Sequence, residues 1–288
     1  MMRSASTDQN IRKSAIAGTW YPGRAAELTR MVDDFLAAVP QTRLPGKLIG
    51  LISPHAGYFY SGQVAAYAYK QVQGLRFDVV TVVSPVHRMY AGPLVVNDCD
   101  YYETPLGWVE VDTDLLRSLE ERIGLSRVRR DDEHSLEIQL PFLQRVLGSF
   151  KLLPIMQGDQ SLTTCQALAE ALADVIQSTG QDRSSPARVL LVASTDLSHF
   201  HSYEAARRLD SVAASFISNY DPIGLSQALQ NGSTEACGGG PVISVMLAAR
   251  ALGATHAQVL HYANSGDVTG DRTRVVGYLA AALYQRTD

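Results

Sequence analysis

Short apolar runs rich in β-branched residues alternate along the chain with longer segments in which apolar residues recur every three or four positions. The first pattern is typical of buried strands and the second of amphipathic helices, so their alternation predicts βα units around a largely parallel sheet flanked by helices. Strands are expected at 48–52, 77–83, 93–96, 107–111, 150–155, 188–194, 257–263 and from 273 onward. Helices are expected at 61–72, 113–123, 135–147, 161–177, 203–218, 222–230 and 240–252.

Individual residues predict several helix boundaries. Asp112 and Ser161 each precede a helical segment and can cap it, because their side-chain oxygens accept hydrogen bonds from the free amides of a first helical turn. Gly124 is expected to end the first of these helices. Pro141 removes an amide donor inside the segment 135–147, so we expect that helix to be kinked or restarted there.

The chain is predicted to form one α/β domain. With 46% hydrophobic and 19% charged residues in a length of 288, it can bury a large core. No Ser/Gly-rich linker, repeat or low-complexity tract divides it. We therefore expect a single domain over residues 11–288, preceded by a polar, disordered tail over residues 1–10.

The charge and the apolar runs exclude several classes of partner. The net charge of -4 arises from 25 basic and 29 acidic residues and gives no broad cationic surface for nucleic acid or an anionic membrane. No apolar run reaches the roughly 18 residues of a membrane span, and the N-terminal sequence lacks the apolar segment of a secretory signal. Three widely spaced cysteines predict no disulfide framework. We therefore expect a cytoplasmic protein that binds neither nucleic acid nor a membrane.

Three of the predicted strands end on a serine that is followed by titratable side chains. The segment LISPH ends at His55, VVSPVH ends at His87, and VASTDLSH contains Asp196 and His199. Ligands of open α/β sheets bind beyond the carboxyl ends of the strands, so we expect these side chains to converge on one crevice. Neutral imidazoles are common ligands of zinc, iron and copper, which makes His55 and His87 candidate metal ligands. The alternative for each histidine is a partly exposed loop residue.

Asp196 and His199 are candidates for acid–base chemistry. They are three residues apart, so they would share one face if the chain turned helically after the strand. The carboxylate could then hold the imidazole in the tautomer that a base or a metal ligand needs.

Cys237 is the candidate for a third metal ligand. It precedes a glycine run and the helical segment 240–252, whose amino terminus is expected to lower the pKa of the thiol. A thiolate would bind a metal ion or attack an electrophile. The alternative is a small buried apolar residue, which is also the interpretation of Cys99 and Cys165.

Further candidates lie in three other segments. Glu133, His134 and Glu137 form an acidic and imidazole cluster in DDEHSLEIQL, where a role in the site and a structural role are both open. Trp20 in AGTWYPG could wall a crevice or anchor a turn, and Tyr58 is a further pocket candidate. The motifs of P-loops, dinucleotide-binding folds, nucleophile elbows and HExxH zinc proteases are absent, which excludes the commonest nucleotide-binding and hydrolase functions.

Several of these segments form an ordered set of motifs. Along the chain the motifs are AGTWYPG, SPHAGYFYSG, SPVH, YETPLGWVEVD, DEHSLEIQLPFL, STDLSHF, ACGGGP and a final strand, RVVGYLAAAL. This set resembles the Memo family, whose bacterial and archaeal members are also called AmmeMemoRadiSam system protein B, and it covers nearly the whole chain. The resemblance implies the fold of class III extradiol dioxygenases, which are non-haem iron enzymes. It also implies a functional link to a radical SAM protein.

The resemblance implies a set of site residues as well. The family's metal-binding histidines fall on His55 and His87, its cysteine ligand falls on Cys237, and Asp196 and His199 line the same pocket. The related dioxygenases have a carboxylate as the third ligand. A thiolate is softer than a carboxylate and can be oxidised, so ring cleavage does not follow from the resemblance. We expect the site to bind iron or copper, and zinc can occupy it in purified material.

These residues support three functions. The first is a metal-dependent oxidoreductase with iron or copper held by His55, His87 and Cys237, in which His199 donates or accepts a proton with the aid of Asp196. The second is a non-catalytic binding module that uses the same crevice for a peptide or another small ligand, such as an anion. The third is a hydrolase in which Cys237 is a nucleophile activated by His199.

Overall fold

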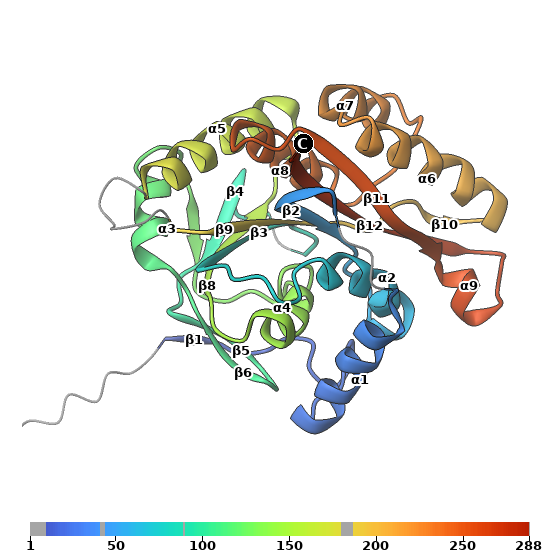
Figure 1. Ribbon diagram of the computed structural model, residues 1–288, viewed down its shortest axis with the longest axis horizontal. Coiled ribbons are helices and arrows are strands. Elements are labelled where there is room, and N and C mark those ends of the chain that lie inside the picture. Colours follow the sequence, from blue (N-terminus) through green and yellow to red (C-terminus); the bar gives the residue numbers. More distant parts are fainter. Residues whose placement is uncertain (1–9, 41–43, 89, 180–186, 288) are drawn as a thin grey trace, which may run out of the picture.

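The computed structural model describes residues 10–40, 44–88, 90–179 and 187–287 (Figure 1). The predicted N-terminal tail therefore lies, except for Asn10, outside the described residues. The described chain forms a large sheet between two layers of helices, which confirms the predicted α/β class.

Four parallel strands form the centre of the main sheet. In sheet order they are β2 (Gly46–Ser53), β9 (Val189–Ser194), β3 (Val79–Pro85) and β8 (Lys151–Gln157). Every residue of β3 is buried, and the strand is a nearly continuous apolar run, as a strand covered by helices on both faces requires. The predicted parallel pairing is confirmed for this centre.

The outer strands join the sheet mainly by antiparallel pairing. One side is extended by β12 (Val275–Arg286), β11 (His256–Asn264) and β10 (His199–His201), all in antiparallel pairs. On the other side β4 (Leu94–Asn97) pairs antiparallel with β8, and β7 (Ser126–Val128) pairs parallel with β4. The connection between β11 and β12 is too short for a crossover, so these two strands pair as antiparallel neighbours.

A second, small sheet lies at the N-terminal end of the described chain. It consists of β1 (Ile11–Arg12), β5 (Tyr101–Thr104) and β6 (Gly107–Glu110). The strand predicted at 107–111 is therefore confirmed, but it belongs to a hairpin in this small sheet.

The helices pack on both faces of the main sheet. The upper layer in Figure 1 holds α5 (Leu162–Ser178), α6 (Tyr203–Ser218), α7 (Pro222–Gln230) and α8 (Gly239–Ala251). The lower layer holds α1 (Ala25–Ala38), α2 (Tyr58–Lys70) and α4 (Leu140–Leu147). Two shorter helices, α3 (Thr113–Glu120) and α9 (Ser265–Thr269), contact α5 and β12, respectively. Within the described residues, none of these helices has the length and apolar character needed to cross a membrane.

Most of the predicted helix boundaries are found in the structure. Asp112 caps α3 and Ser161 caps α5, each by accepting a hydrogen bond from an amide of the first turn, at 3.1 and 3.3 Å. Pro141 lies in the first turn of α4, which follows a separate 3-10 helix, η1 (Glu137–Gln139), so the predicted restart is confirmed. The prediction that the first of these helices continues to Gly124 is wrong, because α3 ends one turn earlier.

Glu137 in η1 is wholly buried and holds the N-terminal segment in place. Its carboxylate accepts hydrogen bonds from Arg12 Nη1 at 2.6 Å, from the hydroxyl of Tyr21 at 2.6 Å and from the amide of Ala15 at 2.9 Å. Arg12 is also buried and forms a second ion pair with Asp131 at 2.5 Å. Of the two roles left open for Glu137 by the sequence, these contacts support the structural one.

We predict that Glu137→Ala lowers the free energy of unfolding by about 3–5 kcal/mol, because it leaves the buried guanidinium with one partner fewer. Urea denaturation of the metal-free protein measures this change. Asp114→Asn is the control: it removes an exposed partner of Arg117, and a shift below about 0.5 kcal/mol is expected. A loss of less than about 1 kcal/mol in Glu137→Ala would contradict the structural role.

Candidate metal centre

Parallel pairing brings three strand ends to the same edge of the sheet. Ser53 of β2 is level with Ser194 of β9, and Val83 of β3 is level with Ala193 of β9. The two Ser-Pro segments and the segment after β9 therefore leave the sheet side by side. Their titratable side chains meet beyond the strand ends, as the sequence pattern predicted.

Cys237 reaches the same place from the loop before α8. Its amide donates a hydrogen bond to the carbonyl of Asp196 at 3.2 Å, and its sulfur accepts one from the amide of Asp196 at 3.3 Å. A Cβ atom at Gly238 would lie 2.2 Å from the carbonyl oxygen of Ser194. Glycine at this position therefore lets the loop pack directly against the end of β9.

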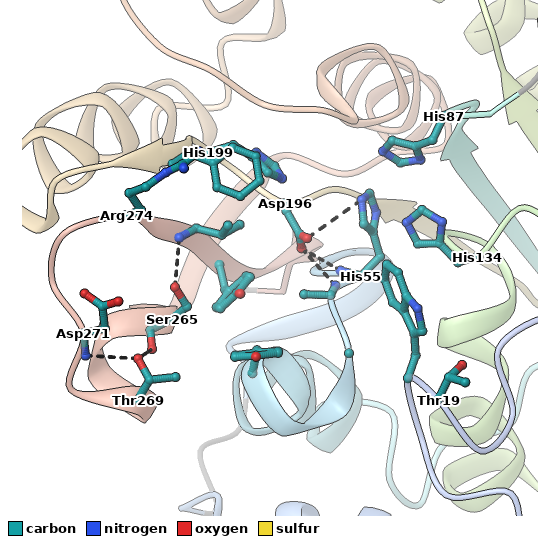
Figure 2. Close-up of a pocket in the computed structure, with 17 residues that line it drawn as sticks. Thr19, His55, His87, His134, Asp196, His199, Ser265, Thr269, Asp271 and Arg274 are labelled. Atoms are coloured by element: carbon teal, nitrogen blue, oxygen red, sulfur yellow. Dashed lines mark hydrogen bonds and ion pairs between the residues drawn. The ribbon is translucent and has the colours of Figure 1, made fainter.

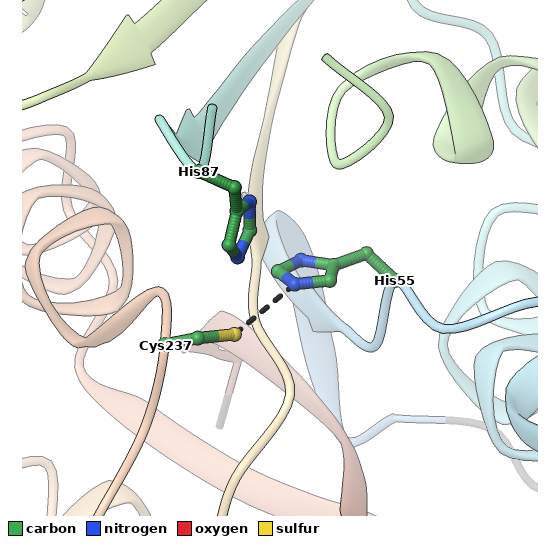
Figure 3. Close-up of side chains that lie close together, drawn as sticks. All are labelled: His55, His87 and Cys237. Atoms are coloured by element: carbon green, nitrogen blue, oxygen red, sulfur yellow. Dashed lines mark hydrogen bonds between the residues drawn. The ribbon is translucent and has the colours of Figure 1, made fainter. Parts of the chain in front are cut away.

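His55, His87 and Cys237 form a compact set of donor atoms (Figure 3). One ring nitrogen of each histidine and the sulfur all lie within 4.8 Å of one another, and the sulfur is 3.1 Å from His55 Nε2. Two imidazoles and a thiol are ligands that zinc, iron and copper accept. The donor types and their spacing therefore fit a transition-metal ion.

Hydrogen bonds fix the tautomer of His55. Ser194 Oγ donates its single proton to the carbonyl of Ser135 at 2.6 Å and accepts a hydrogen bond from Gln139 Nε2 at 2.8 Å. His55 Nδ1 lies 3.0 Å from the same oxygen and must therefore be the donor. The lone pair of His55 then resides on Nε2, the atom that faces Cys237, so the ring is prepared to bind a metal ion.

Glu133 and His134 flank His87. Glu133 Oε1 accepts hydrogen bonds from the amides of His87 and Arg88 at 2.8 and 2.7 Å, which fixes the backbone that carries the His87 ring. The ring of His134 is centred 4.7 Å from that of His87 and 4.2 Å from that of Trp20. Of these predicted residues, His134 and Trp20 line the pocket and Glu133 supports it from behind.

Asp196 and His199 are held separately. Asp196 Oδ1 accepts hydrogen bonds from the amides of His55 and Ala56 at 2.8 and 3.3 Å, so the carboxylate positions the His55 segment. His199 Nδ1 donates to the carbonyl of Leu197 at 2.8 Å, which leaves Nε2 as the acceptor nitrogen. The helical turn that was expected to pair Asp196 with His199 is not formed, because the chain continues into β10.

His55 and His87 of the donor set line one end of a pocket of about 610 Å³ (Figure 2). Trp20 and Tyr60 provide aromatic surface along it. Its far end contains Phe200, Asp271 and Arg274, where the guanidinium carbon of Arg274 lies 5.1 Å from the centre of the Phe200 ring. The pocket therefore combines an end lined by imidazoles with a far end that carries an aromatic ring, a guanidinium and a carboxylate.

Some pocket residues were not predicted, and Tyr58 was assigned to the wrong place. Tyr58 is buried in the core, where its hydroxyl donates to the carbonyl of Ile138 at 2.8 Å, whereas Tyr60 lines the pocket. Two residues apart on a helix, these side chains point about 200° away from each other. Phe200 and Arg274 also line the pocket, and their only signal in the sequence is the position of Phe200 next to a candidate histidine.

Burial keeps His55, His134 and His199 neutral. Burial, reinforced by the nearby ring of His87, lowers the pKa of His55 well below its ordinary value and lowers the pKa of His134 to about 4. Burial also lowers the pKa of His199. The same loss of hydration raises the pKa of Asp196 to about 7, although two backbone amides oppose the rise. Neutral imidazoles are the form that binds a metal ion.

The prediction of a lowered pKa for Cys237 is wrong. Burial raises the pKa of this thiol well above its ordinary value, and the nearby carboxylate of Asp196 adds to the rise. The helix α8 begins at Gly239, two residues farther on, and its amino terminus does not offset these effects. Without a metal ion the sulfur therefore holds its proton, which metal binding must displace.

Comparison with known proteins finds one family along most of the chain. The family described as Memo-like protein matches residues 12–282. A MEMO1 family protein of Methanosarcina mazei is 35% identical over 272 residues, which cover 94% of this chain and 98% of that protein. MEMO1 family proteins of Methanopyrus kandleri and Pyrobaculum aerophilum are 33% and 32% identical, and each comparison covers 96% of this chain and 99% of the relative.

We predict that His134 lowers the free energy of unfolding as the pH falls. Between its ordinary pKa of about 6.5 and its folded pKa of about 4, the unfolded chain binds a proton that the folded chain does not, so this residue lowers stability as pH falls. Relative to His134→Gln, the metal-free wild type should lose about 1.4 kcal/mol of unfolding free energy per pH unit between pH 6 and 4.5.

Denaturant titrations of both proteins at several pH values measure this difference. Asp196 acts in the opposite sense, because its raised pKa favours the folded protein as pH falls from 7 toward 4, but it is present in both proteins and cancels. A difference that does not change with pH would contradict the neutral state of His134.

Proposed function

The chain belongs to the family of Memo-like proteins, as its motifs predicted, and we propose that it is a metal-dependent redox protein that holds iron or copper. One observation carries the proposal: His55, His87 and Cys237 come from three separate segments and place their donor atoms within 4.8 Å of one another, and the two histidines also line a pocket. Zinc fits the same donors and is expected in some purified material.

The residues around these donors support redox catalysis. An iron or copper ion would supply one-electron chemistry and a coordination position for a small ligand. His199 lines the pocket, and its Nδ1 is occupied by a backbone carbonyl, so Nε2 is free to accept or donate a proton there. Asp196, with its pKa of about 7, can also exchange a proton near neutral pH while its other oxygen holds the His55 segment.

The thiol defines how this proposal differs from ring-cleaving dioxygenases. A thiolate ligand is softer than a carboxylate and can itself be oxidised. We therefore propose an oxidoreductase that is related to extradiol dioxygenases by fold and has little or no ring-cleaving activity. Its proposed substrate is a small molecule or a peptide. A cytoplasmic location and a functional link to a radical SAM protein are part of the same proposal.

A non-catalytic binding module is the second candidate. Arg274 lies over the exposed ring of Phe200 at the far end of the pocket, a surface that can hold an anionic or aromatic group without any redox chemistry. The third candidate, a hydrolase with Cys237 activated by His199, is not favoured, because the sulfur of Cys237 forms its hydrogen bond to an imidazole with His55.

We predict that His55→Ala and His87→Ala each weaken metal binding by at least about 100-fold, because losing a ligand costs more than losing a residue that only orients one. The free energy of unfolding of the metal-free protein should change by no more than about 1–2 kcal/mol. Metal analysis after anaerobic loading with Fe2+ measures the effect, with His256→Ala as the control, because His256 at the start of β11 does not line the pocket. Full metal occupancy in a variant that carries both His55→Ala and His87→Ala would contradict the ligand assignment.

We predict further that the metal-loaded protein consumes oxygen in the presence of a reductant and that His199→Ala abolishes this turnover while metal content stays unchanged. Oxygen-electrode assays with ascorbate, paired with elemental analysis, test the expectation. His201→Ala, which alters a neighbouring histidine paired with Glu235, is the control. If His199→Ala turns over normally, or the loaded wild type shows no turnover with any reductant, the binding module is the better account.

A further inference from the structure

A second set of donor atoms adjoins the first. One ring nitrogen each of His87 and His134 and a carboxylate oxygen of Glu133 lie within 4.8 Å of one another. His87 is a member of both sets. Two imidazoles and a carboxylate form a harder donor set than two imidazoles and a thiol, and they suit divalent ions such as Fe2+ and Zn2+.

Two polar atoms of Glu133 and His134 are buried without a partner. Glu133 Oε2 and His134 Nδ1 make no hydrogen bond within the described part of the chain, although Glu133 is only 3% exposed and His134 only 7% exposed. A buried polar atom without a partner costs about 1–3 kcal/mol, and a charged one costs more. Folded proteins seldom leave a buried carboxylate oxygen without a partner, and beside two imidazoles this oxygen points to a missing cation.

The carboxylate of Glu133 is locked in the orientation that exposes its free oxygen to this place. Its Oε1 is held by the amides of His87 and Arg88, at 2.8 and 2.7 Å, so the group cannot rotate to satisfy Oε2 elsewhere. Oε2 lies 3.8 Å from His87 Nδ1. The two amide bonds and the nearby imidazole lower the pKa of Glu133 although burial opposes them, so the carboxylate carries its charge at neutral pH.

The ring of His87 faces both donor sets. Its Nδ1 is the nitrogen near Glu133, and Figure 3 shows its other nitrogen directed toward the space between His55 and Cys237. The side chain of His87 is 27% exposed, so an ion can reach the ring from the pocket. One imidazole can therefore offer a different nitrogen to each of two sites.

We propose that His87, Glu133 and His134 form a second site for a divalent metal ion, with His87 bridging it to the first. The inference rests on the proposed function because the two sites share His87. Binding of the second ion displaces the remaining ring proton of His87, which passes to the solvent. The ion neutralises the buried carboxylate and gives Glu133 Oε2 the partner that it lacks.

Zn2+ titration of chelator-treated protein, followed by desalting and elemental analysis, tests the proposal. We expect two equivalents in the wild type, one in Glu133→Gln and one in His55→Ala. Glu133→Gln keeps an oxygen that can accept from the His87 and Arg88 amides, and it replaces only the metal-binding oxygen. Asp132→Asn, which changes the exposed neighbouring carboxylate, should retain two equivalents.

The same variants show whether a negative result contradicts the proposed second site alone or the proposed first site as well. One equivalent in the wild type, or two equivalents that persist in Glu133→Gln, overturns the second site. A single equivalent that is lost in His55→Ala and kept in Glu133→Gln leaves the proposed function standing, whereas no bound zinc in the wild type overturns both. If Glu133→Gln does not fold by circular dichroism, His134→Phe reports the same stoichiometry.

Discussion

Parallel pairing of β2, β9 and β3 is the constraint on which the site depends. Because Ser53 and Ser194 are level in adjacent strands, the residues that follow them must emerge together, and β3 adds its own end at the same edge. The loop of Cys237 then packs on the end of β9 through Gly238, where no larger residue fits. The register of the backbone thus places the three candidate ligands close together.

Burial determines the chemical state of that set. It lowers the pKa of His55, His134 and His199 and raises the pKa of Asp196 and Cys237, so burial favours the neutral form of each of these groups in the metal-free protein. Neutral imidazoles compete well for a cation, and the hydrogen bond to Ser194 presents the correct nitrogen of His55. Glu133 is the exception, since its amide partners keep it charged beside His87.

The sequence predicted the central strands and the gathering of titratable side chains at their ends because both follow local patterns. Apolar runs mark buried strands, and a titratable residue directly after such a run marks a strand end. The strands missed, such as β1 and β10, are too short to show a period, and α1 was overlooked although Leu28, Val32 and Leu36 repeat every four residues. Side-chain direction and burial depend on tertiary contacts, so the pocket role of Tyr58 and the lowered pKa of Cys237 were wrong.

The central claim is that a metal ion binds the sulfur of Cys237 together with the imidazoles of His55 and His87. X-ray absorption spectroscopy of the zinc-loaded protein tests it most directly, because sulfur and nitrogen ligands differ in bond length. The account predicts a sulfur neighbour at about 2.3 Å beside nitrogen neighbours at about 2.0–2.1 Å, with the sulfur absent in Cys237→Ser. A wild-type spectrum with only nitrogen and oxygen neighbours would contradict it.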